Sequence, residues 1–142
     1  MKAVGAASPV AASPHSFLAF DYGARRVGVA VGNDLLRRAQ PLRSIAAEGD
    51  ARFAAIGALI GEWRPDALVV GVPRHPDGAP HDNTARAQRF ARQLGGRFHL
   101  AVHEVDERYT TTEALAQGAA DVDAASAALI LEQFFREREG GA

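Results

Sequence analysis

The sequence predicts a single α/β domain, and three observations support that prediction. The chain has 142 residues, the length of one ordinary domain, and a chain of this length buries enough surface for a core of its own. Its composition, 47% hydrophobic and 23% charged, is that of a folded globular protein. Short apolar runs of strand formers come first, and helical and strand patterns then alternate. We therefore expect a mixed five-stranded sheet flanked by helices.

The chain divides into one folded domain and two short ends. Residues 1–16, where Ser and Pro interrupt short apolar stretches, are expected to form a flexible leader. The folded domain is expected to span 17–138, followed by a tail of 139–142. No apolar run approaches the length of a membrane span, so we expect no membrane partner. The chain has no cysteine, which excludes a thiolate metal site and agrees with a cytoplasmic location.

Three strands are expected in the first part of the domain. Residues 17–22 and 27–32 are runs of strand formers separated by Gly23 and a basic pair, and they predict a hairpin. A third strand is expected between residues 35 and 46. Pro41 cannot donate to a ladder, so this strand must lie at an edge of the sheet or end near the proline.

Helices and strands are expected to alternate in the remainder of the chain. Each helix is indicated by apolar residues at helical spacing, and each strand by a short apolar run. In chain order, the expected elements are a helix from Asp50 to before Pro65, a strand over 67–72, a helix that stops at Gly95 and Gly96, a strand over 98–105, a short helix from Thr110 and a last helix over 123–138.

Three carboxylates stand out by their positions in this scheme. Asp21 ends the first strand, Glu107 follows the last strand, and Asp123 opens the last helix. Strand ends and helix starts meet at one edge of an open α/β sheet, where ligand crevices usually form. Asp123 also shares a helical face with apolar residues that must contact the sheet, and a carboxylate there is costly unless it is paired. These apolar residues are Ala127, Ile130 and Phe134.

Clustered carboxylates repel one another, and a hard divalent cation such as Mg²⁺ or Mn²⁺ holds them together. Two such ions can align a water and a leaving oxygen across a phosphodiester, so no protein nucleophile is needed. Each acid also has a structural interpretation: Asp21 as a turn residue, Asp123 as a helix cap and Glu107 as a solvated strand-end charge. Their joint placement favours a metal-dependent nuclease.

Four ordered motifs resemble the YqgF (RuvX) family of Holliday-junction-resolvase-like proteins, also described as nucleases that mature the 5′ end of small-subunit ribosomal RNA. The similarity extends from Phe17 to Phe135. The motifs are DYGARRVGVAVG, GVPRHPDG, VDERYTTTEA and VDAASAALILEQFF.

The resemblance implies a ribonuclease-H-like fold and assigns catalysis and metal binding to Asp21, Glu107 and Asp123. Other residues match motif positions of the family, namely Gly23, Arg26, Gly71, Pro73, Arg108, Thr110 and Thr111. One departure is the stretch LAQGAAD at 115–121, because the family usually has a longer and more basic loop there. This departure bears on substrate preference.

The net charge of −1 means that nucleic acid must be bound by a local arginine surface. Arg26 and Arg108 are adjacent to the proposed acids, where a guanidinium can pair with them or hold a phosphate. Together with Thr110 and Thr111, they are our first candidates for nucleic-acid contacts. Arg86, Arg89 and Arg92 share one helix face and come second, the alternative being a solvated surface.

We therefore expect a cytoplasmic hydrolase that cleaves nucleic acid, with RNA favoured over DNA, as a monomer or homodimer. Its expected role is processing of the 5′ end of pre-16S rRNA in ribosome biogenesis. Three alternatives stay open: a Holliday junction resolvase acting on branched DNA, a non-catalytic nucleic-acid-binding protein of the same fold, and an actin-like ATPase. The last needs two such domains to clamp a nucleotide, and this chain has room for one.

Overall fold

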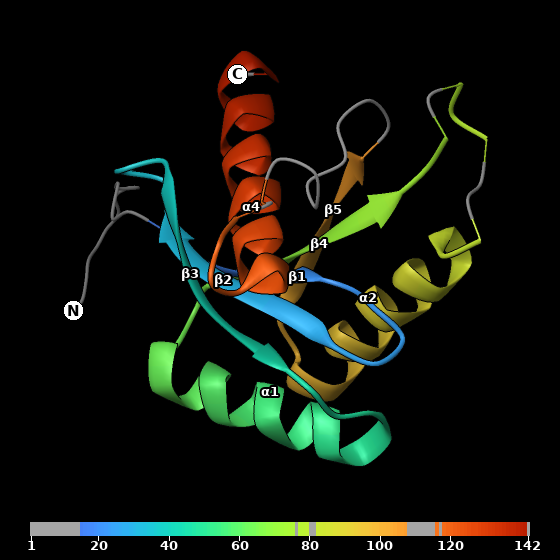
Figure 1. Cartoon of the computed structure of the whole chain (residues 1–142). Helices are drawn as coiled ribbons and strands as arrows, with labels where there is room; N and C mark the ends of the chain where they lie inside the picture. Colours follow the sequence, from blue (N-terminus) through green and yellow to red (C-terminus); the bar gives the residue numbers. More distant parts are fainter. Residues whose placement is uncertain (1–14, 76, 80–81, 108–115, 117, 142) are drawn as a thin grey trace.

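The computed structural model describes residues 15–75, 77–79, 82–107, 116 and 118–141, with side chains up to 138. These residues form a five-stranded sheet with helices on both faces (Figure 1). The strands are β1 (Ser16–Asp21), β2 (Val27–Asn33), β3 (Arg38–Ile45), β4 (Ala67–Pro73) and β5 (Ala101–Glu107). The helices are α1 (Gly49–Trp63), α2 (Thr84–Phe98) and α4 (Val122–Gly141).

The sheet is mixed, as the sequence predicts, with strand order β3-β2-β1-β4-β5. The first three strands form an antiparallel meander, whereas β4 and β5 run parallel to β1. The carboxyl ends of β1, β4 and β5 therefore lie at the same edge of the sheet. β3 is the outermost strand, which confirms that Pro41 lies in an edge strand.

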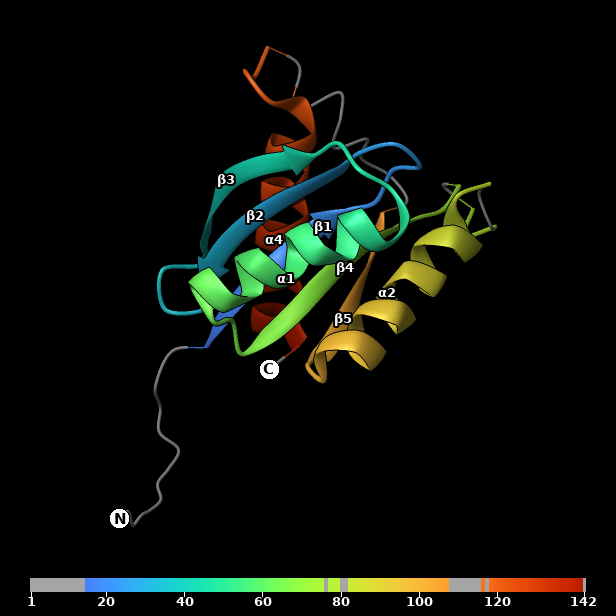
Figure 2. The same cartoon turned by 90° about the horizontal axis from the view of Figure 1, so that it is seen from below.

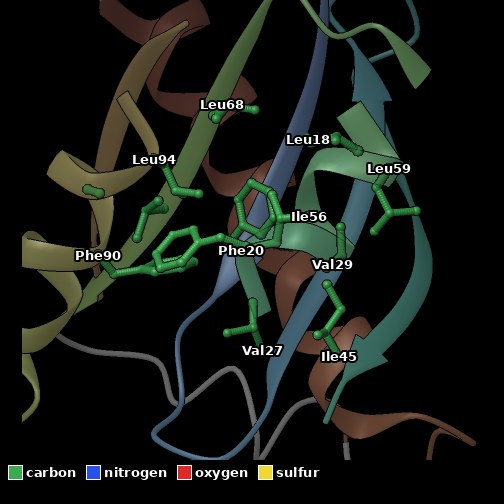
Figure 3. Packing of buried hydrophobic residues seen from close by; sticks show 13 residues of the cluster. Leu18, Phe20, Val27, Val29, Ile45, Ile56, Leu59, Leu68, Phe90 and Leu94 are labelled. Atoms are coloured by element: carbon green, nitrogen blue, oxygen red, sulfur yellow. The ribbon is translucent and has the colours of Figure 1, made fainter. Parts of the chain in front are cut away.

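Each face of the sheet is covered by its own helices because side chains alternate along the strands. Leu18 and Phe20 of β1 pack against α1 and α2, in a cluster that includes Ile56 (Figure 3). Phe17 and Ala19 point the other way and belong to the cluster with residues of α4. Figure 2 shows α1 and α2 over one face, with α4 behind the sheet. Both faces of β1 and β4 are therefore buried.

A side chain of α4 and one from the residue that caps it accept hydrogen bonds from the outer edge of β3. Glu132 Oε2 accepts from the backbone N–H of Ala39 at 3.2 Å, and Asp121 Oδ2 accepts from that of Ser44 at 2.9 Å. The β2–β3 register shifts by one residue between these two contacts, which is a β-bulge. Two edge donors that would otherwise face solvent are thus hydrogen-bonded within the chain.

Helix α1 differs from expectation at its start and ends before Pro65, as expected. Its N-cap residue is Glu48, so Asp50 is not the cap and lies in the first turn, where a carboxylate interacts favourably with the helix dipole. Arg64 ends the helix in the left-handed conformation, with φ of 46°. Leu59 is buried in this helix, whereas Trp63 is 38% exposed and lies at the margin of the core.

Helix α2 does not stop at Gly95 and Gly96, contrary to the prediction. It continues to Phe98, and His99 adopts the left-handed conformation, with φ of 58°. The N–H of His99 donates to the carbonyl of Gly95 at 3.0 Å and so terminates the helix. Because Phe98 is helical, β5 begins at Ala101, later than the sequence suggested.

Helix α4 begins one residue before the expected start and extends beyond Arg138, to Gly141. Its cap is Asp121, whose Oδ1 accepts from the N–H of Ala124 at 3.0 Å, so the proposed alternative role of Asp123 as the cap is excluded. The short helix expected from Thr110 lies outside the described residues. In the ranges that are described, no helix combines the length and apolarity needed to span a membrane.

Candidate active site

Asp21 lies at the carboxyl end of the central strand, between two glycines of the neighbouring strands. It is the register partner of Gly28 on β2 and of Gly71 on β4. Strand alternation places its side chain on the same face as Phe17 and Ala19, which is the face covered by α4. Both flanking positions therefore present no side chain beside the carboxylate.

The first glycine allows α4 to begin directly against β2. A Cβ atom at Gly28 would lie 1.9 Å from the backbone oxygen of Asp123 and 2.9 Å from the backbone nitrogen of Ala124. Any larger residue would overlap backbone that cannot rotate away. Gly28 thus places Asp123 beside the strand position opposite Asp21.

The second glycine makes room for Glu107. A Cβ atom at Gly71 would lie 2.5 Å from Glu107 Oε2 and 2.5 Å from Ile130 Cδ1. Glu107 pairs with Pro73 on β4, and its carboxylate extends back over Gly71 toward the α4 face. Since Gly71 is the neighbour of Asp21, the Glu107 carboxylate approaches Asp21 from the side opposite to Asp123.

The structure therefore brings Asp21, Glu107 and Asp123 to one edge of the sheet, as the sequence predicts. Their convergence depends on Gly28 and Gly71, because these glycines leave the strand positions on both sides of Asp21 without side chains. No three His, Asp or Glu side chains within the described ranges are close enough together to hold a metal ion as they stand. The three carboxylates therefore lie at the same edge of the sheet but are not arranged as a complete set of metal ligands.

The Asp123 carboxylate is held by two other side chains at this edge. Arg26 Nε donates to its Oδ2 at 2.8 Å, and the Ser44 hydroxyl donates to the same oxygen at 3.2 Å. The Asp123 side chain is 23% exposed and that of Arg26 is 63% exposed. Arg26 thus offsets the negative charge on Asp123 while most of its surface stays open to solvent.

Asp121 shares Ser44 with Asp123. The Ser44 hydroxyl donates to Asp121 Oδ1 at 2.6 Å, and the Ser44 N–H donates to Oδ2 at 2.9 Å. Burial raises the pKa of Asp121, but hydrogen bonds from the Ser44 hydroxyl and from the N–H groups of Ala124, Ser44 and Asp123 outweigh burial and hold the pKa below its ordinary value. Asp121 therefore fixes the end of β3 to the start of α4.

A buried arginine supports the loop that carries Arg26. Arg52 is 5% exposed, and its guanidinium donates to the carbonyls of Ala47 at 2.7 Å and Ala24 at 3.0 Å. It also lies 5.6 Å from the centre of the Tyr22 ring. Arg52 therefore holds the β1–β2 loop against the start of α1. In the sequence, Arg52 is four residues before the buried Ile56 and so lies on the buried face of the helix. A charged residue is not normally expected on that face, so its role was not predicted.

A second arginine that the sequence analysis missed lies at the end of β4. Arg74 Nε is 3.4 Å from Asp106 Oδ1, and the Arg74 N–H donates to the carbonyl of Glu107 at 3.1 Å. Gln133 of α4 donates from Nε2 to the carbonyl of Asp106 at 3.0 Å. These contacts fix the backbone that carries Glu107 between β4 and α4. The sequence gives no periodic signal for Arg74, which follows the strand.

Of the other nucleic-acid candidates, those that the structure describes lie on the opposite face of the sheet from the acids. Arg86 and Arg89 are exposed on α2, as expected, but α2 covers the face opposite to α4 (Figure 2). Arg108, Thr110 and Thr111 lie outside the described residues. Of the predicted phosphate contacts, Arg26 is the one that the described structure places beside the acidic edge.

Together, a β3-β2-β1-β4-β5 sheet and acids gathered at the carboxyl edge of β1 define a ribonuclease-H-like protein. Solved structures agree on the fold: Thermus thermophilus RuvC matches with a TM-score of 0.53 at 14% identity, covering 88% of this chain and 96% of that one. RuvC from the same organism in complex with a Holliday junction substrate gives 0.54 at 16% identity, covering 89% and 96%.

The sequence comparisons identify the family. The chain belongs to the RuvX family, described as Holliday junction resolvase, whose profile matches residues 15–137. A protein of Albidiferax ferrireducens named "Putative pre-16S rRNA nuclease" is 68% identical, covering 89% of this chain and 81% of its own. One of Polaromonas sp. with the same name is 65% identical, covering 89% and 96%. The family and the fold expected from the sequence are thus confirmed.

Proposed function

We propose that this chain is a divalent-metal-dependent nuclease that hydrolyses phosphodiester bonds in RNA and processes the 5′ end of pre-16S rRNA in the cytoplasm. The observation that carries the proposal is the placement of Asp21 between Gly28 and Gly71, which admits Asp123 on one side and Glu107 on the other. Membership of the RuvX family and the names of its 68% and 65% identical relatives support the reaction and the RNA substrate.

The side chains at this edge fit a hard divalent cation. Asp21, Glu107 and Asp123 offer only carboxylate oxygens, the donors preferred by Mg²⁺ and Mn²⁺. When bound there, such ions would activate water and stabilise the charge that develops at the scissile phosphate. The three carboxylates would hold the ions, and Ser44 and Asp121 would keep Asp123 in place.

Arg26 has two roles in this proposal. In the structure it pairs with Asp123 and offsets negative charge at the acidic edge. Since its side chain is 63% exposed, it can also donate to a phosphate of the substrate. Replacement of Arg26 by alanine should slow cleavage at saturating RNA as well as weaken binding. Arg108, Thr110 and Thr111 are proposed as neighbouring contacts, and Arg86 and Arg89 as a second set that affects binding alone.

A second candidate function is resolution of four-way DNA junctions. It is favoured by the description of the family and by the fold shared with RuvC in complex with a Holliday junction substrate. Symmetric incision would require a homodimer, whereas RNA processing is compatible with a monomer. A third candidate, binding of nucleic acid without cleavage, predicts no turnover on either substrate.

The two substrates can be compared directly. The purified chain is incubated with a 5′-labelled RNA spanning the mature 5′ end of 16S rRNA and, separately, with a labelled four-way DNA junction, with Mg²⁺, Mn²⁺ or chelator. Asp21→Asn and Asp123→Asn remove candidate ligands. Asp50→Asn is the matched control, because the Asp50 side chain is 99% exposed and lies in α1 on the other face of the sheet.

We expect metal-dependent cleavage of the RNA by the wild type and by Asp50→Asn, and none by the two site variants. Both site variants should keep the far-ultraviolet circular dichroism of the wild type. Faster cleavage of the junction than of the RNA would favour the second candidate. Full activity in chelator, or in either folded site variant, would refute the assignment of these acids.

A further inference from the structure

A second positively charged feature lies away from the acidic edge, between the β2–β3 turn and the C-terminal half of α4. It is a hollow of about 410 Å³, which we call the arginine hollow. Figure 1 shows the two elements that form it side by side at the end of α4 remote from Asp123. Its lining residues are Arg37, Arg38, Glu132, Phe135 and Arg136.

The β2–β3 turn presents two of these arginines in a defined conformation. Asn33 Oδ1 accepts from the N–H groups of Leu35 at 3.1 Å and Leu36 at 2.9 Å, and the Asn33 carbonyl accepts from the N–H of Arg37 at 3.0 Å. Arg37 has φ of 56°, a conformation that is costly for a residue with a Cβ atom. The turn is therefore fixed by hydrogen bonds, and Arg38 follows it as the first residue of β3.

The charge in the hollow is predominantly positive. Arg37, Arg38 and Arg136 are all exposed, and Glu132 is the one acid among those lining residues that the structure describes. The Glu132 carboxylate, which accepts from the N–H of Ala39, offsets one of these positive charges. The described lining residues therefore carry a net positive charge, and the planar donors of arginine suit phosphate.

The hollow lies on the same face of the sheet as the acids. It is lined by the side of α4 that is next to the β2–β3 turn, and α4 begins at the acidic edge, where Asp123 lies in its first turn. From Asp123 to Arg136 the helix rises by about 20 Å. A single nucleic-acid strand that lies along α4 and β3 can therefore contact both regions, and an arginine groove of this kind is typical of single-strand binding.

We propose that the arginine hollow binds phosphates of a nucleic-acid strand at a distance of about 20 Å from the cleaved bond. This inference rests on the proposed function, because that function places the cleaved bond at the acidic edge and so sets the path of the nucleic-acid strand along α4. The shared chemistry is phosphate, which could also come from a free nucleotide. A continuous strand is favoured because the hollow is open and lies on the face that carries the acids.

The test is a salt titration of RNA binding in the presence of chelator, so that no RNA is cleaved. A labelled single-stranded RNA of about twelve nucleotides is used, within the range of known site sizes. Arg38 and Arg136 are changed together to glutamine. Arg64→Gln is the matched control: Arg64 is exposed and ends α1, on the other face of the sheet.

We expect the double variant to bind the RNA roughly tenfold more weakly at low salt, as the loss of two exposed phosphate contacts implies. The slope of log affinity against log salt should flatten by about 1.4, or 0.7 for each contact. Arg64→Gln should keep the wild-type affinity and slope. A thermal melt should show that both variants stay folded.

Three results would overturn the inference: unchanged RNA affinity in the double variant, an equal loss in Arg64→Gln, or a loss of adenosine monophosphate binding without a loss of RNA binding. The last result would identify a small-anion site. A failure of the nuclease proposal looks different, because the wild type would then cleave no RNA with any metal while the double variant still showed weakened binding.

Discussion

The closest approach in the site, between Gly28 and the start of α4, gives a sharp prediction. In Gly28→Ala, the new Cβ atom would lie 1.9 Å from the Asp123 oxygen, whereas ordinary contacts begin at 3.4 Å. The start of α4 must therefore move away from β2 by about 1.5 Å, the difference between these two distances. Because the obstructing atoms are backbone, a change of side-chain rotamer cannot relieve the overlap.

The magnitude follows from this displacement. Overpacking of a rigid contact costs about 3 kcal/mol at the upper end of its range, which corresponds to a fall in Tm of about 10 °C for a domain of this size. Displacement of a reacting group by about 1 Å lowers the rate by roughly 100-fold. We expect a loss of kcat of this size in Gly28→Ala, with little change in RNA affinity, since the arginines are unaltered.

The assay is single-turnover cleavage of the labelled RNA at saturating enzyme, together with a thermal melt and an RNA titration in chelator. Gly61→Ala is the matched control, because a Cβ atom at Gly61 meets nothing within 4 Å and the residue is inside α1. It should gain about 0.5–1 kcal/mol of stability and keep full activity. Wild-type kcat and Tm in Gly28→Ala would refute the contact on which the site is built.

Three further predictions use other contacts at this edge. Gly71→Ala meets side-chain atoms of Glu107 and Ile130 that can rotate away, so kcat should fall while Tm, measured by calorimetry, changes far less than in Gly28→Ala. Arg52→Met should cost about 1–3 kcal/mol in urea unfolding, because it removes the hydrogen bonds that the charged guanidinium donates to the carbonyls of Ala47 and Ala24. It should also weaken RNA binding through the loop that carries Arg26. The Asp121 pKa is lowered by folding, so its contribution to stability is complete above its unfolded pKa of about 4 and is lost as pH falls through the lower folded value. Asp121→Asn, which keeps a capping side chain, should remove that part of the pH dependence of stability below about pH 4, and an unchanged profile would contradict it.

The acids were predictable because their signal is local. Asp21 ends an apolar strand, and Asp123 lies on the apolar face of a helix, so both positions can be inferred from strand ends and helical spacing. The element order follows from the same patterns. Element ends were less predictable: α2 stops at His99 and not at the preceding glycines, since a left-handed residue with a Cβ atom leaves no clear pattern in a sequence.

The contacts that organise the site could not be predicted, because they join residues far apart in the chain. Nothing in the sequence distinguishes Gly28 from any other glycine in a strand, and its role becomes clear only from its contact with the backbone at the start of α4. Ser44 joins Asp121 and Asp123 across more than 70 residues, and nothing near Ser44 in the sequence marks that role. Such contacts depend on the packing of whole elements and not on any local preference.

The contacts along β3 have a consequence for how two copies of the chain could meet. The outward N–H groups of Ala39 and Ser44 already donate to Glu132 and Asp121, and Pro41 between them has no N–H to offer. A neighbouring chain that added a strand here would have to break both bonds and would gain no donor at the proline. The meander side of the sheet is therefore closed to extension, so a homodimer of this protein could not form by adding a strand to β3.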